Sequence, residues 1–178
     1  MKLQTLADSP NLHNKSVLLR VDFNVPLTSD GSVQDDSRIT ASIPTIKYLQ
    51  EKGAKIIIIT HLGRPNGEYK DEYRLTKIAQ KLSALLNKPV KKIDTVIGTA
   101  AEEAAKRLQP GEILMLENVR CEPGEEACDE QFTTALAKLG EIFIQDAFGT
   151  AHRKHASTYG LAHHLPAYAG LLMEKEIK

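Results

Sequence analysis

The chain has 178 residues, of which 42% are hydrophobic and 26% charged, and these proportions are typical of a globular domain with a sizeable core. The 23 basic side chains balance 23 acidic ones, so no overall field would draw the chain to nucleic acid or to an anionic membrane. We therefore expect neither as a partner. A small anionic ligand is not excluded, because local clustering of arginines decides its binding.

The cysteine content and the hydropathy pattern bear on the cellular compartment. The two cysteines, Cys121 and Cys128, are too few for a disulfide framework and favour a reducing environment. The N-terminal segment 1–15 mixes polar and charged residues without an apolar signal segment. The longest aliphatic run, 56–59, is far shorter than the ~20 residues that span a bilayer. We therefore predict a cytoplasmic protein without membrane contact.

Short aliphatic runs alternate along the chain with segments of helical periodicity, which is typical of a parallel α/β sheet. The runs show little polar alternation, as expected for strands covered on both faces. In chain order, strands are predicted at 17–21, 55–59, 113–116 and 142–145, with weaker edge candidates at 89–91 or 95–97. The pair Asp30-Gly31 between Leu27 and Val33 predicts a small hairpin in the first long loop.

Four amphipathic segments between these runs predict helices. The residues expected to cap or open them are Ser37, Thr76, Thr99 (in a capping-box pattern with Glu102) and Asp129. Segment 171–178 has the pattern of a further helix that is cut short. Because no internal repeat or linker is found, residues 1–178 are predicted to form one domain.

Polar residues follow each predicted strand. Because the carboxyl ends of parallel strands meet at one edge of a sheet, these residues are expected to lie together. Guanidinium groups donate paired hydrogen bonds to phosphate and carboxylate oxygens, and Asp and Asn side chains suit a ligand hydroxyl. The pattern indicates a site for a small phosphorylated hydroxy-acid or sugar. The residues concerned are Asp22, Asn24, His61, Arg64, Arg120 and Arg153, with Arg38 at the start of the first helix.

Position and chemistry alone also allow a plainer interpretation, in which these are ordinary surface residues. Arg64 would then pair with Glu68, and Arg120 with Glu122 or Glu125.

Other kinds of site find less support in the sequence. His152 and His155 have helical spacing, but without clustered carboxylates or a paired cysteine motif we predict no metal site. The P-loop, the dinucleotide glycine motif and the hydrolase nucleophile motif do not occur.

The strand exits carry longer motifs, in the order VLLRVDFNVP at 17–26, SRI at 37–39, THLGRP at 60–65, LENVR at 116–120 and DAFGTAHR at 146–153 followed by HAS at 155–157. Together these stretches closely resemble the N-terminal domain of phosphoglycerate kinase. One motif alone would be suggestive, whereas five in order across the whole chain are highly specific. The resemblance implies a Rossmann-like three-layer sandwich with a parallel sheet and helices on both faces.

The resemblance also implies a site for 3-phosphoglycerate and 1,3-bisphosphoglycerate. The implied substrate-binding residues are Asp22, Phe23 and Asn24 for the hydroxy-acid, and Arg38, His61, Leu62, Gly63, Arg64, Arg120 and Arg153 around the carboxylate and phosphate. Arg38 is further implied to be catalytic, because it would neutralise charge on the phosphoryl group in transfer. Cys121 stands where Phe is expected in most relatives, which changes packing beside the site rather than the anion contact.

The implied reaction is the glycolytic, reversible phosphoryl transfer between 1,3-bisphosphoglycerate and Mg-ADP, which gives 3-phosphoglycerate and Mg-ATP. Mg-ATP and Mg-ADP would be bound by a C-terminal nucleotide domain that this sequence lacks, so no residue here is assigned to a nucleotide or metal. We expect a monomer that binds substrate weakly and does not turn over. Two alternatives stay open: a stand-alone phosphometabolite-binding module, and an interaction domain with a vestigial pocket.

Overall fold

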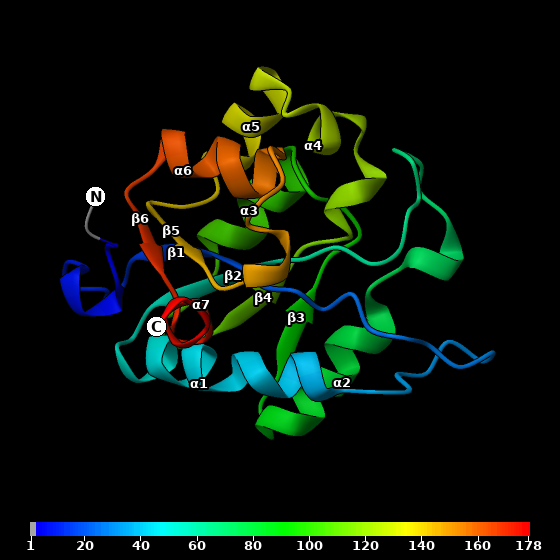
Figure 1. Ribbon diagram of the computed structural model, residues 1–178, viewed down its shortest axis with the longest axis horizontal. Helices are drawn as coiled ribbons and strands as arrows, with labels where there is room; N and C mark the ends of the chain where they lie inside the picture. The colour runs from blue at the N-terminus through cyan, green and yellow to red at the C-terminus, as the bar shows by residue number, and fades with distance from the viewer. Residues whose placement is uncertain (1–2) are drawn as a thin grey trace.

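The computed structural model describes residues 3–178, so the first two residues of the N-terminal segment, in which no signal segment was expected, lie outside it. The described chain forms a six-stranded parallel sheet in the order β3-β4-β2-β1-β5-β6 (Figure 1). The strands are β1 (Ser16–Arg20), β2 (Lys55–Ile59), β3 (Val90–Lys92), β4 (Ile113–Met115), β5 (Ile142–Gln145) and β6 (Ala167–Ala169).

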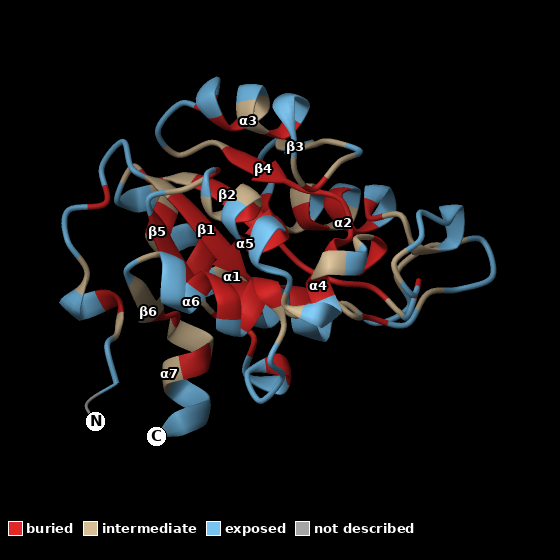
Figure 2. Ribbon diagram, turned by 90° about the horizontal axis from the view of Figure 1, so that it is seen from above, coloured by how far each residue is buried: buried red, intermediate tan, exposed pale blue. Residues whose placement is uncertain are grey.

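Successive residues of the central strands enter two different hydrophobic cores, because side chains alternate between the faces of a sheet. Val17 and Leu19 of β1 belong to one core, and Leu18 between them belongs to the other. Neighbouring strands keep this phase, since Leu18 is paired in register with Ile57 of β2 and Phe143 of β5. The unbroken aliphatic runs of the sequence are therefore explained by burial on both sides, as Figure 2 shows for β1, β2 and β4.

Helices cover both faces of the sheet and complete three layers (Figure 1). One face carries α1 (Ser37–Glu51), α2 (Thr76–Leu86) and α7 (Leu171–Ile177). The other carries α3 (Thr99–Lys106), α5 (Glu130–Ala137) and α6 (Leu161–His164), with the short α4 (Pro123–Ala127) against α5. The predicted α/β sandwich with a parallel sheet and helices on both faces is confirmed.

Most predicted strands are confirmed, and the differences fall at the sheet edges. β2 and β5 have the predicted bounds, β1 is shifted by one residue toward the N-terminus, and β4 ends one residue earlier than predicted. The edge strand is Val90–Lys92 rather than 95–97. β6, whose sequence is Ala167-Tyr168-Ala169, was not predicted. Because it lacks an aliphatic run, only its pairing with β5 defines it as a strand.

The helix starts are a mixed result. Asp129 caps α5 as predicted, since its side chain accepts a hydrogen bond from the Phe132 backbone N–H at 2.8 Å. The predicted caps Ser37 and Thr99 are wrong, because both are the first helical residue. The boundary position before Thr99 belongs to Gly98, whose positive φ of 94° ends the preceding loop. The hairpin is confirmed by an antiparallel bridge between Leu27 and Val33.

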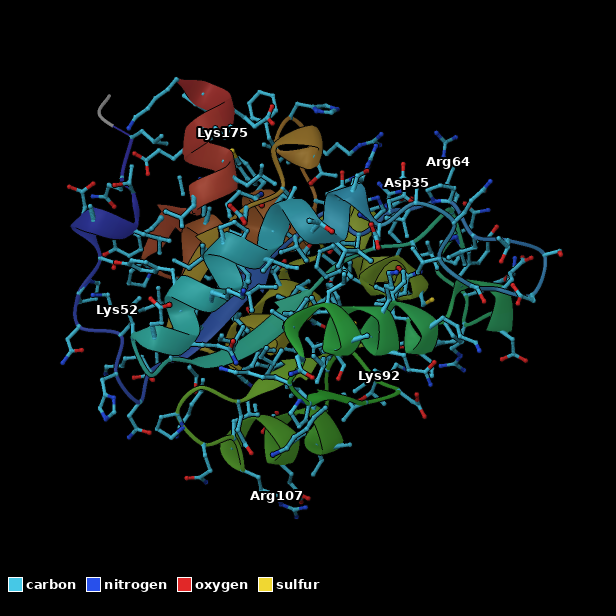
Figure 3. All side chains as sticks on the ribbon, turned by 90° about the horizontal axis from the view of Figure 1, so that it is seen from below. Asp35, Lys52, Arg64, Lys92, Arg107 and Lys175 are labelled. Atoms are coloured by element: carbon cyan, nitrogen blue, oxygen red, sulfur yellow. The ribbon has the colours of Figure 1, made fainter. Side chains whose placement is uncertain are left out.

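The loops after β1, β2, β4 and β5 meet at one end of the molecule. Figure 3 shows Arg64 and Asp35, which precedes α1, at this end, and Lys52, which follows α1, at the opposite end. The end marked by Arg64 is therefore the carboxyl edge of the sheet, where α/β proteins bind ligands.

None of the helices formed by residues 3–178 has the length and apolar character needed to cross a bilayer.

Candidate functional site

A small polar pocket of about 240 Å³ lies at the carboxyl edge of the sheet. It is formed by the exits of β1, β2, β4 and β5 together with the start of α1. Its lining residues are Asp22, Asn24, Arg38, His61, Gly63, Arg64, Arg120, Gly149, Thr150 and Arg153. Four guanidinium groups thus surround one cavity that contains a single carboxylate, Asp22, so the pocket is strongly cationic.

Asp22 and Arg38 connect the exit of β1 to the first turn of α1. Asp22 Oδ2 lies 2.8 Å from a guanidinium nitrogen of Arg38, and Asp22 Oδ1 accepts a hydrogen bond from the Asn24 backbone N–H at 3.1 Å. The Arg38 side chain remains 54% exposed. Asp22 therefore directs this arginine at the pocket and leaves most of its donors available to a ligand.

The exits of β1 and β2 are joined by side chain to backbone hydrogen bonds. Asn24 Oδ1 accepts from the Gly63 N–H at 2.9 Å, and Thr60 Oγ1 accepts from the Phe23 N–H at 3.0 Å. Gly63 has a φ of 60°, and a Cβ added there would lie 2.4 Å from the ring of Tyr73. Glycine is therefore required at this point of the pocket wall.

Asn118 performs the same task between the exits of β2 and β4. Its Oδ1 accepts from the backbone N–H groups of Leu62 at 3.3 Å and Arg120 at 3.1 Å, and its Nδ2 donates to the carbonyl oxygens of Leu62 and Tyr73. Because one buried amide holds both loops, the distance between their pocket residues is fixed before a ligand arrives. The sequence analysis did not identify Asn118 in this role.

Arg120 is almost fully buried, at 5% exposed, and is only partly satisfied. One of its guanidinium nitrogens donates to the Gly63 carbonyl oxygen at 3.1 Å. Its Nε lies 3.5 Å from a Glu126 carboxylate oxygen but makes no hydrogen bond with any described residue. A buried donor left without a partner is unfavourable and is a feature of sites that await a ligand.

His61 is buried in the pocket wall, at 2% exposed, and is uncharged at neutral pH. Burial lowers the pKa of its imidazole to about 2, and the positive charges of Arg20, Arg120 and Arg153 contribute in the same direction. Its Nδ1 lies 3.0 Å from a guanidinium nitrogen of Arg20. His61 therefore offers the pocket a neutral side chain in the middle of a cationic cluster.

All the predicted site residues except Phe23 and Leu62 line the pocket. The side chains of Phe23 and Leu62 lie in the hydrophobic core instead, where each supports the loop that carries its neighbours. The pocket also includes Gly149 and Thr150, which the sequence analysis did not name as site residues. Their position in the segment after β5 was a usable signal, because the exits of β1, β2 and β4 also contribute to the pocket.

The particular ion pairs expected from the plainer interpretation of the arginines are not formed among residues 3–178. Glu68 pairs with Lys70 rather than with Arg64, and Arg120 has Glu126 as its ion-pair partner. Arg64 is exposed, and Figure 3 shows its side chain at the surface of the molecule. The four arginines thus line one cavity, and Arg120 retains a buried Nε without a hydrogen bond to any described residue.

A metal ion is less compatible with this arrangement. Over residues 3–178, no group of three or more His, Cys, Asp or Glu side chains is placed to hold one. The residues present therefore do not fit the magnesium ion of a nucleotide, and we derive no step through such an ion. What the pocket can do chemically is bind and orient a small multivalent anion.

The fold and the pocket define this chain as an α/β domain with a cationic pocket at the carboxyl edge of a parallel sheet. The sequence model of one family, described as phosphoglycerate kinase, matches residues 6–178. The chain belongs to the phosphoglycerate kinase family.

Individual relatives agree with this assignment. The phosphoglycerate kinase of Chloroflexus aggregans is 54% identical over 165 residues, which are 92% of this chain and 41% of the relative. That of Dictyoglomus turgidum is 49% identical over 180 residues, or 100% of this chain and 45% of the relative. The crystal structure of phosphoglycerate kinase from Pyrococcus horikoshii superposes with a TM-score of 0.89 at 41% identity, covering 98% of this chain and 44% of that one. The chain thus spans less than half the length of these relatives.

Proposed function

We propose that this chain is the substrate-binding domain of a phosphoglycerate kinase and that its cationic pocket binds 3-phosphoglycerate and 1,3-bisphosphoglycerate. The observation that carries the proposal is the convergence of Arg38, Arg64, Arg120 and Arg153 on one small cavity. Asp22 and Asn24 complete that cavity with groups suited to a hydroxyl. A phosphate, a carboxylate and a hydroxyl on three adjacent carbons would match these three kinds of group.

The proposed reaction is phosphoryl transfer between 1,3-bisphosphoglycerate and Mg-ADP. The nucleotide and its magnesium would be held by a separate domain, since the relatives are more than twice as long as this chain. In this scheme Arg64, Arg120 and Arg153 bind and orient the substrate. Arg38, whose guanidinium is half exposed at the mouth of the pocket, neutralises charge on the phosphoryl group in transfer.

The further expectations from the sequence belong to the same proposal. The protein would act in the cytoplasm, as a monomer, with all of residues 1–178 in one domain. Two free thiols, Cys121 and Cys128, are compatible with a reducing compartment.

Calorimetric titration of the chain with 3-phosphoglycerate tests the binding proposal. Glycerate, which lacks the phosphate, and inorganic phosphate serve as matched ligands. We expect 3-phosphoglycerate to bind more tightly than either, because it engages the arginines and Asp22 together. Equal affinity for inorganic phosphate alone would contradict the proposed substrate, and no response to any of the three would favour a vestigial pocket.

A variant locates the binding in the pocket. Arg120→Met should weaken binding of 3-phosphoglycerate by about 2 kcal/mol, or roughly 30-fold, because it removes a desolvated charged donor. The matched control is Arg107→Met, since the Arg107 side chain is 80% exposed and forms a surface ion pair with Glu103 of α3. The control should bind like the original chain.

Turnover is tested separately. A coupled assay with 1,3-bisphosphoglycerate and Mg-ADP should detect no ATP formation by the isolated chain. Robust ATP formation would show that the nucleotide site lies within these residues. It would overturn the proposal that a separate domain holds the nucleotide.

A further inference from the structure

A buried polar chain of side chains runs behind the pocket, outside its lining residues. It begins at Arg20, the last residue of β1, which is only 1% exposed. The guanidinium of Arg20 uses all three nitrogens: Nε donates to Ser157 Oγ at 2.9 Å, Nη1 to the Val21 carbonyl oxygen, and Nη2 contacts His61 Nδ1 at 3.0 Å. Because each of its three nitrogens has a partner, the position of this buried guanidinium is closely fixed.

The other end of this chain is the buried carboxylate Glu125 of α4. Ser157 lies in a single π-helical turn, Ala156–Gly160, a rare conformation often found beside functional sites. Its hydroxyl accepts from Arg20 and is therefore free to donate to Glu125 Oε1, 2.5 Å away, while its backbone N–H donates to Glu125 Oε2 at 2.9 Å. Both carboxylate oxygens thus act as acceptors. Burial raises the pKa of the Glu125 carboxyl, whereas the positive charge of Arg20 and the hydrogen bonds from Ser157 favour its ionised form.

The contact with Arg20 determines which tautomer His61 adopts. A guanidinium N–H can only donate, so Nδ1 of His61 must accept and carries no hydrogen. A neutral imidazole with a bare Nδ1 carries its single hydrogen on Nε2. Among residues 3–178, no acceptor is hydrogen-bonded to this second nitrogen, and His61 is part of the pocket lining.

We propose that Arg20 is a positioning residue, which acts through its contact with Nδ1 to hold His61 as a neutral Nε2–H donor toward an oxygen of the bound anion. The identity of that anion rests on the proposed function, whereas the tautomer does not. Glu125 and Ser157 support this arrangement, because their hydrogen bonds hold Arg20 in place. The pocket thereby gains the Nε2–H of His61 as a donor, and the contact between Arg20 and Nδ1 fixes the direction of this donor.

The charged groups around His61 determine how this donor responds to pH. Arg20 faces it from β1, Arg120 from the exit of β4, and Arg153 and His155 from the segment after β5, while Glu125 and Asp22 act on Arg20. Burial and these cations lower the pKa of His61 to about 2. Burial lowers the pKa of Arg20 only to about 10, so Arg20 stays cationic. His61 therefore remains neutral, with the same tautomer, throughout pH 5–8.

Nitrogen NMR of the imidazole rings tests the tautomer in the ligand-free chain. Between pH 5 and 8, we expect His61 to show a protonated Nε2, an unprotonated Nδ1 and no titration. A hydrogen on Nδ1, or a titration midpoint within this range, would overturn the proposal. Because no ligand is needed, this result is independent of whether 3-phosphoglycerate is the substrate.

A variant tests whether Arg20 causes this state. Arg20→Met alone would leave Glu125 buried without its cation, so the informative change is Arg20→Met combined with Glu125→Gln, which removes both charges. In this double variant we expect His61 to populate both tautomers and to titrate closer to the ordinary histidine pKa of about 6.5. The matched control, Arg107→Met with Glu103→Gln, removes an exposed pair of the same charge.

Binding provides the second readout. At pH 7.5 the double variant should bind 3-phosphoglycerate about threefold to tenfold more weakly, because one oriented hydrogen bond is lost. At pH 5.5 the deficit should shrink, because the histidine then becomes charged. A folded double variant with the original imidazole spectrum and an unchanged pH profile would show that Arg20 is only structural. If the original chain binds no 3-phosphoglycerate, the proposed function fails, and the imidazole spectra still decide the role of Arg20.

Discussion

Two buried carboxylates, Glu117 and Glu125, lie at the exit of β4 and in the segment that follows it, and both are fully inaccessible to solvent. Glu117 accepts hydrogen bonds from the backbone N–H groups of Leu75 and Asn118, each at 2.9 Å. It also pairs with Lys92 at 2.6 Å and with Arg74 at 3.4 Å. Its neighbourhood joins β3, β4 and the start of α2, and none of these groups lines the pocket.

The network of Glu125 has a different end point. It passes through Ser157 and Arg20 to His61, which lines the pocket, and beside it the buried Nε of Arg120 makes no hydrogen bond with any described residue. Closed networks contribute stability or specificity of fold, whereas a buried network that ends in free donors retains binding capacity for a ligand. Burial of a charged group alone therefore does not distinguish a structural residue from a candidate binding residue. The distinguishing feature is whether all hydrogen-bond donors of the buried network have partners.

The largest effect is expected on stability, in the network of Glu117. Glu117→Ala should lower the free energy of unfolding by about 3–5 kcal/mol, because Lys92, only 11% exposed, loses the buried partner of its charge. Urea unfolding measures this loss. The affinity of the folded variant for 3-phosphoglycerate should not change.

The control for this variant is Glu103→Ala, which breaks an exposed ion pair with Arg107 and should change stability by less than about 1 kcal/mol. A loss of similar size in both variants would remove the distinction between the two networks.

The next largest effect is expected on catalysis, at the half-exposed Arg38 of the pocket. In a chain completed with a nucleotide domain, Arg38→Ala should lower kcat on the order of 100-fold or more, with a smaller effect on KM. This corresponds to about 2.7 kcal/mol, lost only in the transition state. Stability should hardly change, because the Arg38 side chain is 54% exposed and its ion pair with Asp22 is close to the surface.

Steady-state kinetics with 3-phosphoglycerate as the varied substrate checks this assignment. Arg64→Ala and Arg153→Ala are the comparison variants, and both should act mainly on KM. An Arg38→Ala enzyme with an intact kcat would refute the catalytic role of this arginine.

The smallest effect sharpens the comparison with a third buried carboxylate, Asp146. Its Oδ1 accepts from the backbone N–H groups of Leu172 at 2.9 Å and Met173 at 3.2 Å, at the start of α7, and within residues 3–178 it forms no ion pair. Burial raises the pKa of Asp146 to about 6, from a model-peptide value of 3.8, despite these hydrogen bonds. The folded state therefore binds a proton more tightly than the unfolded chain.

The sign of the pH dependence follows from this shift. The stability that Asp146 contributes is fully present below about pH 4 and is lost as the pH rises through about 6. Asp146→Asn keeps the acceptor for α7 and removes the titration. The stability of the original chain relative to this variant should therefore fall by roughly 2 kcal/mol between pH 4 and 7. Urea unfolding at several pH values measures the difference, and parallel curves for both proteins would contradict the expectation.

Much of the fold and site could be predicted from the sequence. The aliphatic runs of β1, β2, β4 and β5 identify strands because burial on both faces leaves no room for polar alternation. The residues that follow such strands must meet at one edge of the sheet, so the arginines and Asn24 could be placed together. The exceptions, Phe23 and Leu62, have side chains in the core, because their loops also need anchoring.

The remainder depended on contacts between distant parts of the chain. β6 is a strand only because it pairs with β5, and Asp146, though it follows β5 like a site residue, turns to cap α7 instead. In the sequence, Arg20 is one charged residue at the end of an aliphatic strand, and nothing nearby indicates its partner. That partner, Ser157, lies 137 residues away. Periodicity and strand position are local properties that the sequence alone determines. The pairing of buried charges is decided only by the tertiary structure, because it depends on which side chains are brought together away from water.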